Sequence, residues 1–272
     1  MTKTVFITGA SRGFGKLWTT ALLQKGYNVA ATARNIGSLD ELVNQYKDQI
    51  LPLQLDVTDR KSVFETIKKA KTHFGSIDIL INNAGYGLFG ALEENTEEEV
   101  RQQMETNFFG LVWVTQAVLP IMREQGSGHI IQLSSALGLV SFPTLGLYSA
   151  SKFAVEGLSE SLAAEVKGFG INVTIVEPNE FSTDWGGASA QSSSALLAYD
   201  TVRTNFYALL SDDMVGVPEA TVPAMIKLVE SENPPLRLLL GKAGLPMAKY
   251  GFETRLATWE SWIDVSNAAH GK

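Results

Sequence analysis

The chain has 272 residues, no cysteine and a formal net charge of −7 at pH 7. This length allows one large α/β domain, and we expect residues 1–272 to form one. The lack of cysteine excludes disulfides and thiolate metal sites, and the scattered histidines favour no metal site of another kind. An acidic chain without a basic cluster argues against a nucleic-acid partner. We expect a soluble, cytoplasmic protein, because no apolar run is long enough to span a membrane and the first expected strand leaves no room for a signal peptide.

The N-terminal segment combines a strand, a glycine-rich turn and a helix. Residues 4–8 are apolar or β-branched and predict a buried strand. Glycines at 9, 13 and 15 follow at once, in a spacing that differs from the commoner G-x-G-x-x-G, and an apolar helix pattern begins near Leu17. A plain tight turn would explain the glycines alone. The strand before them and the helix after them favour a phosphate site, because the free N–H groups of a helix N-terminus face such a turn.

The rest of the chain alternates short apolar runs with amphipathic helical patterns. The runs that we expect to form strands after the first are 28–32, 50–55, 77–81, 129–133, 171–176 and 236–240. This alternation predicts an α/β fold: a doubly wound, parallel, seven-stranded Rossmann-like sheet with helices on both faces. Ligands of such sheets bind at the carboxyl ends of the strands. The polar groups that follow expected strands are Gly9, Arg34, Asp56, Asn82 and Ser135.

Two segments outside the regular alternation are expected to shape the substrate site. They are a loop and helix at about 182–215 and a C-terminal segment at about 241–272. Residues 182–195 are small and polar, and we expect them to form a mobile loop.

Tyr148 and Lys152 stand four residues apart in the sequence YSASK, which lies in an expected helix. Side chains with this spacing share one helix face. An ammonium beside a phenol favours the phenolate and lowers the tyrosine pKa, which suits a general acid or base. By itself, the spacing fits a solvent-exposed helix face better than a catalytic pair, and the rest of the chain reverses this.

The motifs TGASRGFG, LDVTD, NNAG, METNFFG, QLSSA and YSASK occur in one order along residues 3–185. Together they resemble the short-chain dehydrogenase/reductase family. The resemblance implies that Tyr148 is the general acid in carbonyl reduction and the base in alcohol oxidation, with Lys152 lowering its pKa and binding the nicotinamide ribose. It also implies that Ser135, or alternatively Ser134, binds the substrate oxygen. Asn107 would hold a helix irregularity and a water that relays protons to Lys152, although a helix-interior asparagine that bonds only backbone is the simpler interpretation.

The same resemblance implies a nicotinamide dinucleotide as cofactor. After the second expected strand stand Ala33 and Arg34, where sites for NAD carry an acidic residue. We therefore expect NADP(H), with Arg34 and Arg12 facing the 2′-phosphate. Asn82 is expected to lie beside the adenosine. The expected cofactor-binding residues are Gly9, Ser11, Arg12, Gly13, Phe14, Gly15, Arg34, Asp56, Val57, Asn83, Ala84, Gly85, Tyr148, Lys152, Pro178, Phe181 and Thr183.

The expected substrate is a ketone or secondary alcohol with an apolar or aryl body, because the candidate pocket side chains are mostly apolar. They are Ser135, Leu137, Phe142, Leu145, Tyr148, Glu180, Trp185 and Phe206. One departure from the family stands next to this set: Asn179 and Glu180 follow Pro178 where a glycine is usual. We expect Asn179 to adopt the positive φ of that glycine, and the pair either to reshape the pocket mouth or to be a tolerated loop.

The sequence leaves a second class of function open. A non-catalytic NADP(H)-binding sensor protein could use the same fold, although such proteins commonly lose the tyrosine or lysine that this chain keeps. Members of the family are usually dimers or tetramers, so a homodimer or homotetramer is expected, formed through the apolar helix faces at 107–119 and 147–166.

Overall fold

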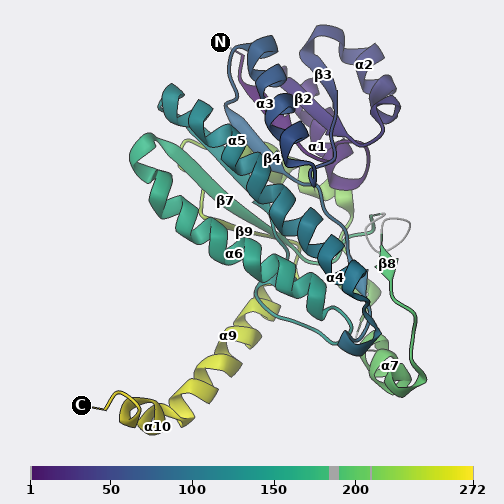
Figure 1. Cartoon of the computed structure of the whole chain (residues 1–272), viewed down its shortest axis with the longest axis vertical. Helices are drawn as coiled ribbons and strands as arrows, with labels where there is room; N and C mark the ends of the chain where they lie inside the picture. Colours follow the sequence, from purple (N-terminus) through teal and green to yellow (C-terminus); the bar gives the residue numbers. More distant parts are fainter. Residues whose placement is uncertain (1, 184–189, 209, 272) are drawn as a thin grey trace.

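The computed structural model of the chain, which describes residues 2–183, 190–208 and 210–271, is built around one parallel sheet (Figure 1). The strands are β1 (Thr4–Ile7), β2 (Asn28–Ala33), β3 (Ile50–Gln54), β4 (Ile79–Asn82), β6 (Gly128–Leu133), β7 (Ile171–Pro178) and β9 (Arg237–Leu240). They lie in the order β3-β2-β1-β4-β6-β7-β9 and pair in parallel throughout. The predicted seven-stranded, doubly wound fold is confirmed.

The sheet is buried on both faces, which explains why its strands are continuously apolar. In β1, for example, Val5 and Ile7 belong to one core cluster and Phe6 belongs to the cluster on the opposite face. The helices are α1 (Gly13–Gln24), α2 (Asp40–Tyr46), α3 (Arg60–Phe74), α4 (Glu97–Met104), α5 (Gly110–Gln125), α6 (Gly146–Val166), α7 (Asp200–Ala208), α8 (Val222–Glu230), α9 (Gly244–Ser261) and α10 (Ile263–Ala268). Helices α1, α2 and α8 cover one face, and α3, α5 and α6 cover the other.

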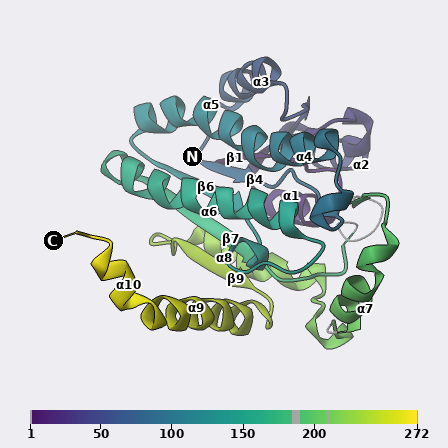
Figure 2. The ribbon, with the colours of Figure 1, turned by 60° about the horizontal axis from the view of Figure 1, so that its bottom comes forward.

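The C-terminal helices leave this arrangement of one sheet between two layers of helices. In both orientations α9 and α10 extend away from the sheet and its covering helices (Figure 2). Gly244 and Ala248 in the first turns of α9 are buried, whereas Trp259 and Trp262 near its end are more than half exposed. No helix in the described part of the chain is both long and apolar enough to cross a bilayer.

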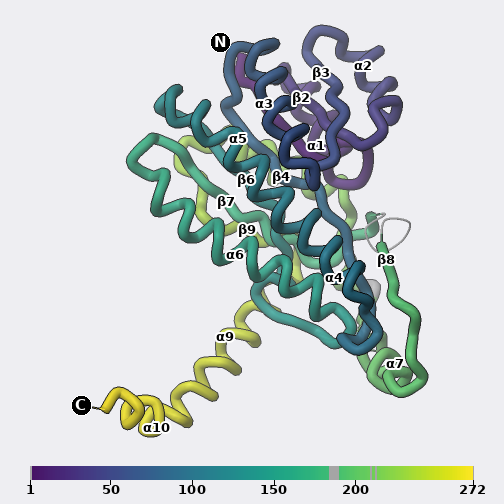
Figure 3. Tube along the Cα trace, in the orientation of Figure 1, coloured from purple at the N-terminus to yellow at the C-terminus, as the bar shows by residue number. Residues whose placement is uncertain are grey.

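A second, two-stranded sheet was not predicted from the sequence. Strand β5 (Leu88–Phe89) pairs in parallel with β8 (Gln191–Ser192), about a hundred residues later in the chain. Figure 3 labels β8 on the stretch of chain that leads to α7. Residues 182–195 were expected to be a loop, but Gln191 and Ser192 within them form a strand. Each run has only two residues, so neither carries a recognisable strand pattern.

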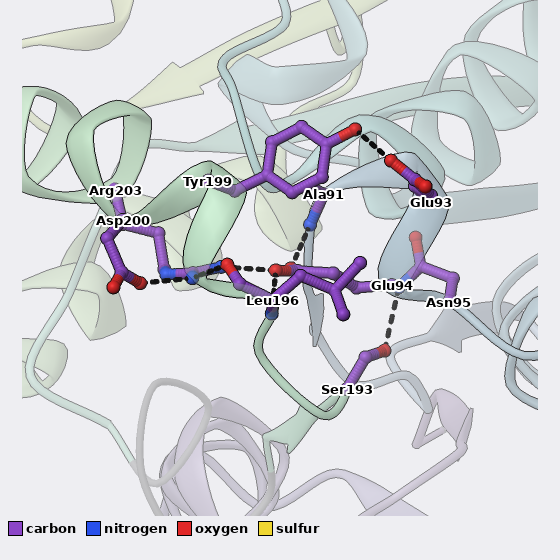
Figure 4. A network of polar contacts seen from close by, with 9 residues as sticks. All are labelled: Ala91, Glu93, Glu94, Asn95, Ser193, Leu196, Tyr199, Asp200 and Arg203. Carbon is purple, nitrogen blue, oxygen red and sulfur yellow. Dashed lines mark hydrogen bonds and ion pairs between the residues drawn. The ribbon is translucent and has the colours of Figure 1, made fainter.

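A network of polar contacts fastens the segment after β8 to the residues before α4 (Figure 4). At its centre, the side chain of Glu94 is only 1 % exposed and forms an ion pair with Arg203 on α7. The Glu94 carboxylate also accepts hydrogen bonds from the backbone N–H groups of Ala91 and Leu196, each at 2.7 Å. The Leu196 N–H, followed by Arg203, lowers the pKa of Glu94 below its ordinary value.

The partners of Glu94 are held by further contacts in the same network. Arg203 also donates to the carbonyl of Leu196 and to the carboxylate of Asp200, both at 2.6 Å. Two other pairs cross between the same segments: Tyr199 donates to Glu93 at 2.6 Å, and Asn95 donates to Ser193 at 2.8 Å. Charge-assisted bonds to a desolvated carboxylate are the strongest of these contacts. Glu94 and Arg203 therefore form the main attachment of α7 to the body.

We predict that Arg203→Met loosens the segment around α7 without unfolding the sheet. The buried Glu94 carboxylate would lose its cationic partner, so amide hydrogen exchange at 191–208 should accelerate at least severalfold while exchange in β1 and β4 stays unchanged. The matched control is Arg101→Met, because Arg101 pairs with Glu97 and both side chains are at least 74 % exposed. Equal exchange at 191–208 in wild type and Arg203→Met would contradict this role.

The attachment of α7 through Glu94 and Arg203 should weaken as the pH falls. Because the pKa of Glu94 is lowered in the folded chain, its stabilisation is present above the ordinary glutamate pKa and is lost as the pH falls through the lowered pKa. Exchange at 191–208 should therefore accelerate in acid in the wild type, and this acceleration should be smaller in Arg203→Met.

Candidate active site

A single cavity of about 1300 Å³ lies at the carboxyl ends of the sheet strands. It has a polar half beside the glycine-rich turn and an apolar half beside α7 and α9. The predicted residues that line it are Gly9, Ser11, Arg12, Gly13, Phe14, Arg34, Asp56, Val57, Asn83, Ala84, Gly85, Ser135, Leu137, Phe142, Leu145, Tyr148, Lys152, Pro178, Glu180, Phe181, Thr183 and Phe206. Gly15 and Asn107 are not among the lining residues, and Trp185 lies outside the described residues.

The glycine-rich turn has the geometry of a phosphate cradle. Gly9 and Gly13 have positive φ values of 68° and 50°, which favour glycine. A Cβ atom on Gly15 would lie 2.0 Å from the carbonyl oxygen of Gly9, so Gly15 allows α1 to approach β1 closely rather than contacting a ligand. No side chain caps the N-terminus of α1. Its backbone N–H groups are thus available to an anion, and a dinucleotide pyrophosphate fits this half of the cavity.

Asn83 ties the glycine-rich turn to the end of β4. Its side-chain amide donates to the carbonyls of Thr8 and Gly9 at 2.9 and 3.0 Å. We expected Asn82 to lie beside the adenosine, and the structure shows that this prediction was wrong. Its amide points into the core and donates to Thr115 and Gln132 at 2.9 and 2.8 Å. The reason is strand alternation, because successive side chains point to opposite sides.

Tyr148, Lys152 and Ser135 come together at the floor of the cavity, where each is at least 90 % buried. The hydroxyls of Ser135 and Tyr148 are hydrogen-bonded to each other. The Lys152 ammonium donates to the carbonyl of Leu133 at 2.7 Å and lies 5.8 Å from the centre of the Tyr148 ring. Ser134, the alternative to Ser135, is buried, does not share this contact, and its hydroxyl has no hydrogen-bond partner among the described residues. The geometry therefore favours Ser135.

Burial dominates the proton affinities of this group. It raises the pKa of Tyr148 well above that of a free tyrosine, and the hydrogen bond from Ser135 lowers it only in part. Burial also lowers the pKa of Lys152 to about 8, against the opposing effect of Glu156. Burial is the largest influence on the Tyr148 pKa, and the lowering of that pKa by Lys152 stays a prediction. Tyr148 is consequently protonated at neutral pH, as a proton donor must be.

Asn107 lies in an irregular helical turn, as the resemblance implied. A π-helical turn (Glu105–Phe109) joins α4 to α5, and Asn107 is buried within it. Its carbonyl oxygen accepts from the Tyr86 N–H at 3.0 Å, and its amide donates to the Tyr86 carbonyl at 2.9 Å and to the Ser151 hydroxyl at 3.3 Å. These bonds hold the segment after β4 against α6, directly behind Lys152.

The apolar half of the cavity is built from distant parts of the chain. Leu137, Leu145, Tyr148 and Phe206 form one buried cluster, and the Phe142 ring lies 5.7 Å from that of Phe206. The sequence did not single out several lining residues from the C-terminal third, because isolated apolar residues there carry no distinguishing signal. These are Tyr207, Leu210, Met214 and Met247.

Asn179 and Glu180 differ in how they are held. Asn179 does not adopt the positive φ that we expected, since Lys47 and Thr144 are the non-glycine residues with positive φ in the described chain. Its amide donates to the carbonyls of Glu180 and Met214 at 2.8 and 2.9 Å, and its carbonyl oxygen accepts from the Ala243 N–H at 3.3 Å. Glu180, in contrast, is exposed at the cavity rim.

A serine-hydrolase site is not supported, even though Gly9–Gly13 also has the form G-x-S-x-G. Such a site needs a histidine beside the serine. The three histidines all belong to the described chain, and none of them lines the cavity that contains Ser11.

Comparisons with known proteins agree with this geometry. Residues 3–194 match the family model of the short chain dehydrogenases. The chain is 40 % identical to oxidoreductase BOA17 of Botryotinia fuckeliana, over 99 % of this chain and 100 % of that protein. It is 41 % identical to the 3-ketodihydrosphingosine reductase of Bacteroides thetaiotaomicron, over 87 % of each protein.

Two solved structures extend the likeness to three dimensions. A short-chain dehydrogenase from Streptomyces avermitilis superposes with a TM-score of 0.92 at 38 % identity, covering 98 % of each chain. ElxO with NADP bound gives a TM-score of 0.76 at 28 % identity, covering 90 % of this chain and 100 % of that one. With the fold, the glycine-rich turn and the Ser135–Tyr148–Lys152 group all in place, the chain belongs to the short-chain dehydrogenase family and is an oxidoreductase of that family.

Proposed function

We propose that the protein transfers hydride between NADP(H) and a ketone or secondary alcohol, with Tyr148 as general acid and base. The observation that carries the proposal is the hydrogen-bonded Ser135–Tyr148 pair beside the buried Lys152, at the point where the phosphate cradle and the apolar pocket meet. A carbonyl oxygen at this point can accept from both hydroxyls.

The residues of the chain supply the proton chemistry of this reaction. When bound, the nicotinamide supplies or accepts the hydride, which no side chain can do. Ser135 and Tyr148 place two donors where negative charge develops on the substrate oxygen, and Tyr148 gives its proton to that oxygen in reduction. Lys152 holds a positive charge behind Tyr148, which stabilises the phenolate after the proton has left. In alcohol oxidation the same groups act in reverse.

The residues at the rim of the polar half of the cavity favour NADP(H) over NAD(H). Arg12 and Arg34 line the cavity and are exposed, so their guanidinium groups are accessible to a phosphate. Ala33, the last residue of β2, is buried and brings no carboxylate that would repel a 2′-phosphate. ElxO, which is similar in fold, binds NADP, and this supports the same cofactor here.

The substrate that fits best has an extended apolar body next to its carbonyl. Leu137, Phe142, Leu145 and Phe206 surround the approach to Tyr148, and burial of such side chains against a ligand favours an apolar one. The similarity to a 3-ketodihydrosphingosine reductase is consistent with a ketone of this kind.

The first test of this proposed function concerns Tyr148. Tyr148→Phe removes the proton donor and one of the two hydrogen bonds to the carbonyl oxygen, so kcat for ketone reduction should fall by ~10²–10⁴-fold or more. NADPH binding, followed by the change in its fluorescence, should stay near normal because the cradle is untouched. The control is Tyr207→Phe, which lines the same cavity and should keep its activity. Turnover close to wild type in Tyr148→Phe would refute the mechanism, and a wild type that binds NADPH but reduces no ketone would favour the sensor protein.

The second test of the proposed function concerns the cofactor. Wild type should have a higher kcat/KM with NADPH than with NADH, and Arg34→Asp should lower the NADPH value by roughly ten- to a hundredfold, the worth of a charge-assisted bond to phosphate. Arg123→Asp on the surface of α5 is the matched control and should leave the ratio unchanged. An equal or higher kcat/KM with NADH in the wild type would show that the arginines do not bind the 2′-phosphate.

The third test of the proposed function separates Asn179 from Glu180. Asn179→Gly removes the bonds that hold Met214 and Ala243 at the apolar end of the cavity, so the ranking of ketones by kcat/KM should change while NADPH affinity stays within about twofold. Glu180→Gly should change the ranking less, because this side chain is exposed. If the double variant keeps the wild-type ranking, the two residues are only part of a loop.

A further inference from the structure

A second group of buried charges lies behind the catalytic residues, where α6, β7 and β9 meet (Figure 1). Glu156 is on α6, one turn after Lys152, and Glu177 is the penultimate residue of β7. Their side chains are only 7 % and 1 % exposed. Arg237, the first residue of β9, connects them to the surface, with a side chain that is 34 % exposed. None of these residues lines the cavity.

Arg237 contacts both buried carboxyl groups through the same nitrogen. Its Nη1 lies 2.8 Å from Oε1 of Glu177 and also contacts Oε2 of Glu156. Its other terminal nitrogen, Nη2, lies 3.6 Å from Oε2 of Glu160, whose side chain is 63 % exposed. The buried part of the cluster therefore contains two carboxyl groups and one guanidinium.

If Glu156 and Glu177 are both ionised, one of their buried carboxyl oxygens has no hydrogen-bond donor. Oε1 of Glu156 is buried and has no hydrogen-bond donor among the described residues. Two adjacent buried carboxylates repel each other, and an unpaired buried charge is costly. One proton held between the two carboxyl groups removes both problems, since a protonated carboxyl becomes a donor. In agreement, burial and then the charge of Glu156 raise the pKa of Glu177 to about 7.

The backbone near Ser135 is shaped to admit this cluster. A Cβ atom on Gly138 would lie 2.9 Å from Cγ of Glu156 and 2.6 Å from the hydroxyl oxygen of Ser134. Only a glycine lets the short helix that follows Ser135 pack onto the Glu156 side chain. The two carboxyl groups therefore belong to the buried packing that supports the catalytic residues, and they do not lie at the surface.

We propose that Glu156 and Glu177 share one proton, and that this pair, anchored by Arg237, adjusts the negative charge behind Lys152 as the pH changes. Glu156 and Glu177 are positioning residues, because they act through Lys152 and do not touch the cavity. The coupling to catalysis rests on the proposed function, whereas the shared proton does not. Below the pKa of the pair the buried part of the cluster carries one negative and one positive charge. Above the pKa of the pair it gains a second negative charge, one helical turn from the lysine, which favours the ammonium form against burial.

Few other charges in the described chain face this cluster. On α6 they are Lys152 and Glu160, and β7 and β9 contribute Glu177 and Arg237 themselves. From α9, Arg255 lies over the outward-facing ring of Phe153 and not over Glu156. A titration of this cluster near neutral pH would therefore come from the carboxyl pair or from Lys152, and the variants below separate the two.

The shared proton is tested first by stability against pH. A carboxyl whose pKa rises from 4.5 in the unfolded chain to about 7 in the folded chain stabilises the fold fully below 4.5, and this contribution is lost as the pH rises through 7. Glu177→Gln mimics the protonated form, so its Tm should fall less than that of the wild type between pH 5 and 8. Glu160→Gln, at the exposed end of the cluster, should follow the wild type. Parallel curves for wild type and Glu177→Gln would overturn the shared proton.

The effect on Lys152 is tested without turnover. In protein with isotope-labelled lysine side chains, the Lys152 resonance is assigned with Lys152→Met and titrated by NMR. Its pKa should be lower in Glu156→Gln and Glu177→Gln than in wild type, by roughly one unit. It should be unchanged in Glu160→Gln. An unchanged Lys152 titration in both variants would overturn the coupling, even if the stability curves differ.

The pH profile of ketone reduction connects the pair to catalysis. In both Gln variants the high-pH limb of kcat should move to lower pH by a similar amount, whereas Glu160→Gln should match the wild type. A limb that stays in place while the Lys152 titration moves would contradict the catalytic part of the proposal. Absence of any ketone reduction in wild type would refute the proposed function, and the stability and NMR measurements would still decide whether the pair exists and affects Lys152.

Discussion

All seven strands of the main sheet run in the same direction, and the position of the site follows from this constraint. Parallel pairing brings the carboxyl ends of β1, β2, β4, β6 and β7 to one edge. The glycine-rich turn, Arg34, Asn83, Ser135 and Pro178 stand at or just after those five ends. Residues spread over about 170 positions in the sequence therefore line one cavity. An antiparallel order would have sent neighbouring strand ends to opposite edges.

Burial shifts the pKa values of the catalytic side chains at this edge of the sheet. The first turns of α6 carry Tyr148 and Lys152 into the interior, and desolvation keeps the tyrosine protonated while it weakens the hold of the lysine on its proton. A buried ammonium needs compensation. It has the Leu133 carbonyl as a hydrogen-bond acceptor and the negative charge of Glu156 one turn away. The polar lining of α6 thus continues from the cavity into the core, and the carboxyl pair links the catalytic helix to β9.

The apolar half of the cavity depends on contacts between segments that are far apart in the chain. The β5–β8 pairing and the Glu94–Arg203 ion pair attach α7 to the body, and Asn179 connects the end of β7 to the residues before α9. None of these contacts belongs to the sheet or its covering helices. Changes in this part of the chain can consequently alter the pocket while the cofactor half and the fold remain intact.

The sequence by itself determined the parallel seven-stranded fold, because strands buried on both faces must be apolar along their whole length. It also located the glycine-rich turn, Ser135, Tyr148 and Lys152, whose motifs are local and have defined spacings. Only the tertiary structure decided which way individual polar side chains point, as the burial of Asn82 shows. The β5–β8 strands, the late pocket residues and the Glu156–Glu177–Arg237 cluster were also invisible, because each depends on pairing distant residues whose local patterns are ordinary. Long-range packing buries the two carboxyl groups of that cluster, and burial raises the pKa of Glu177.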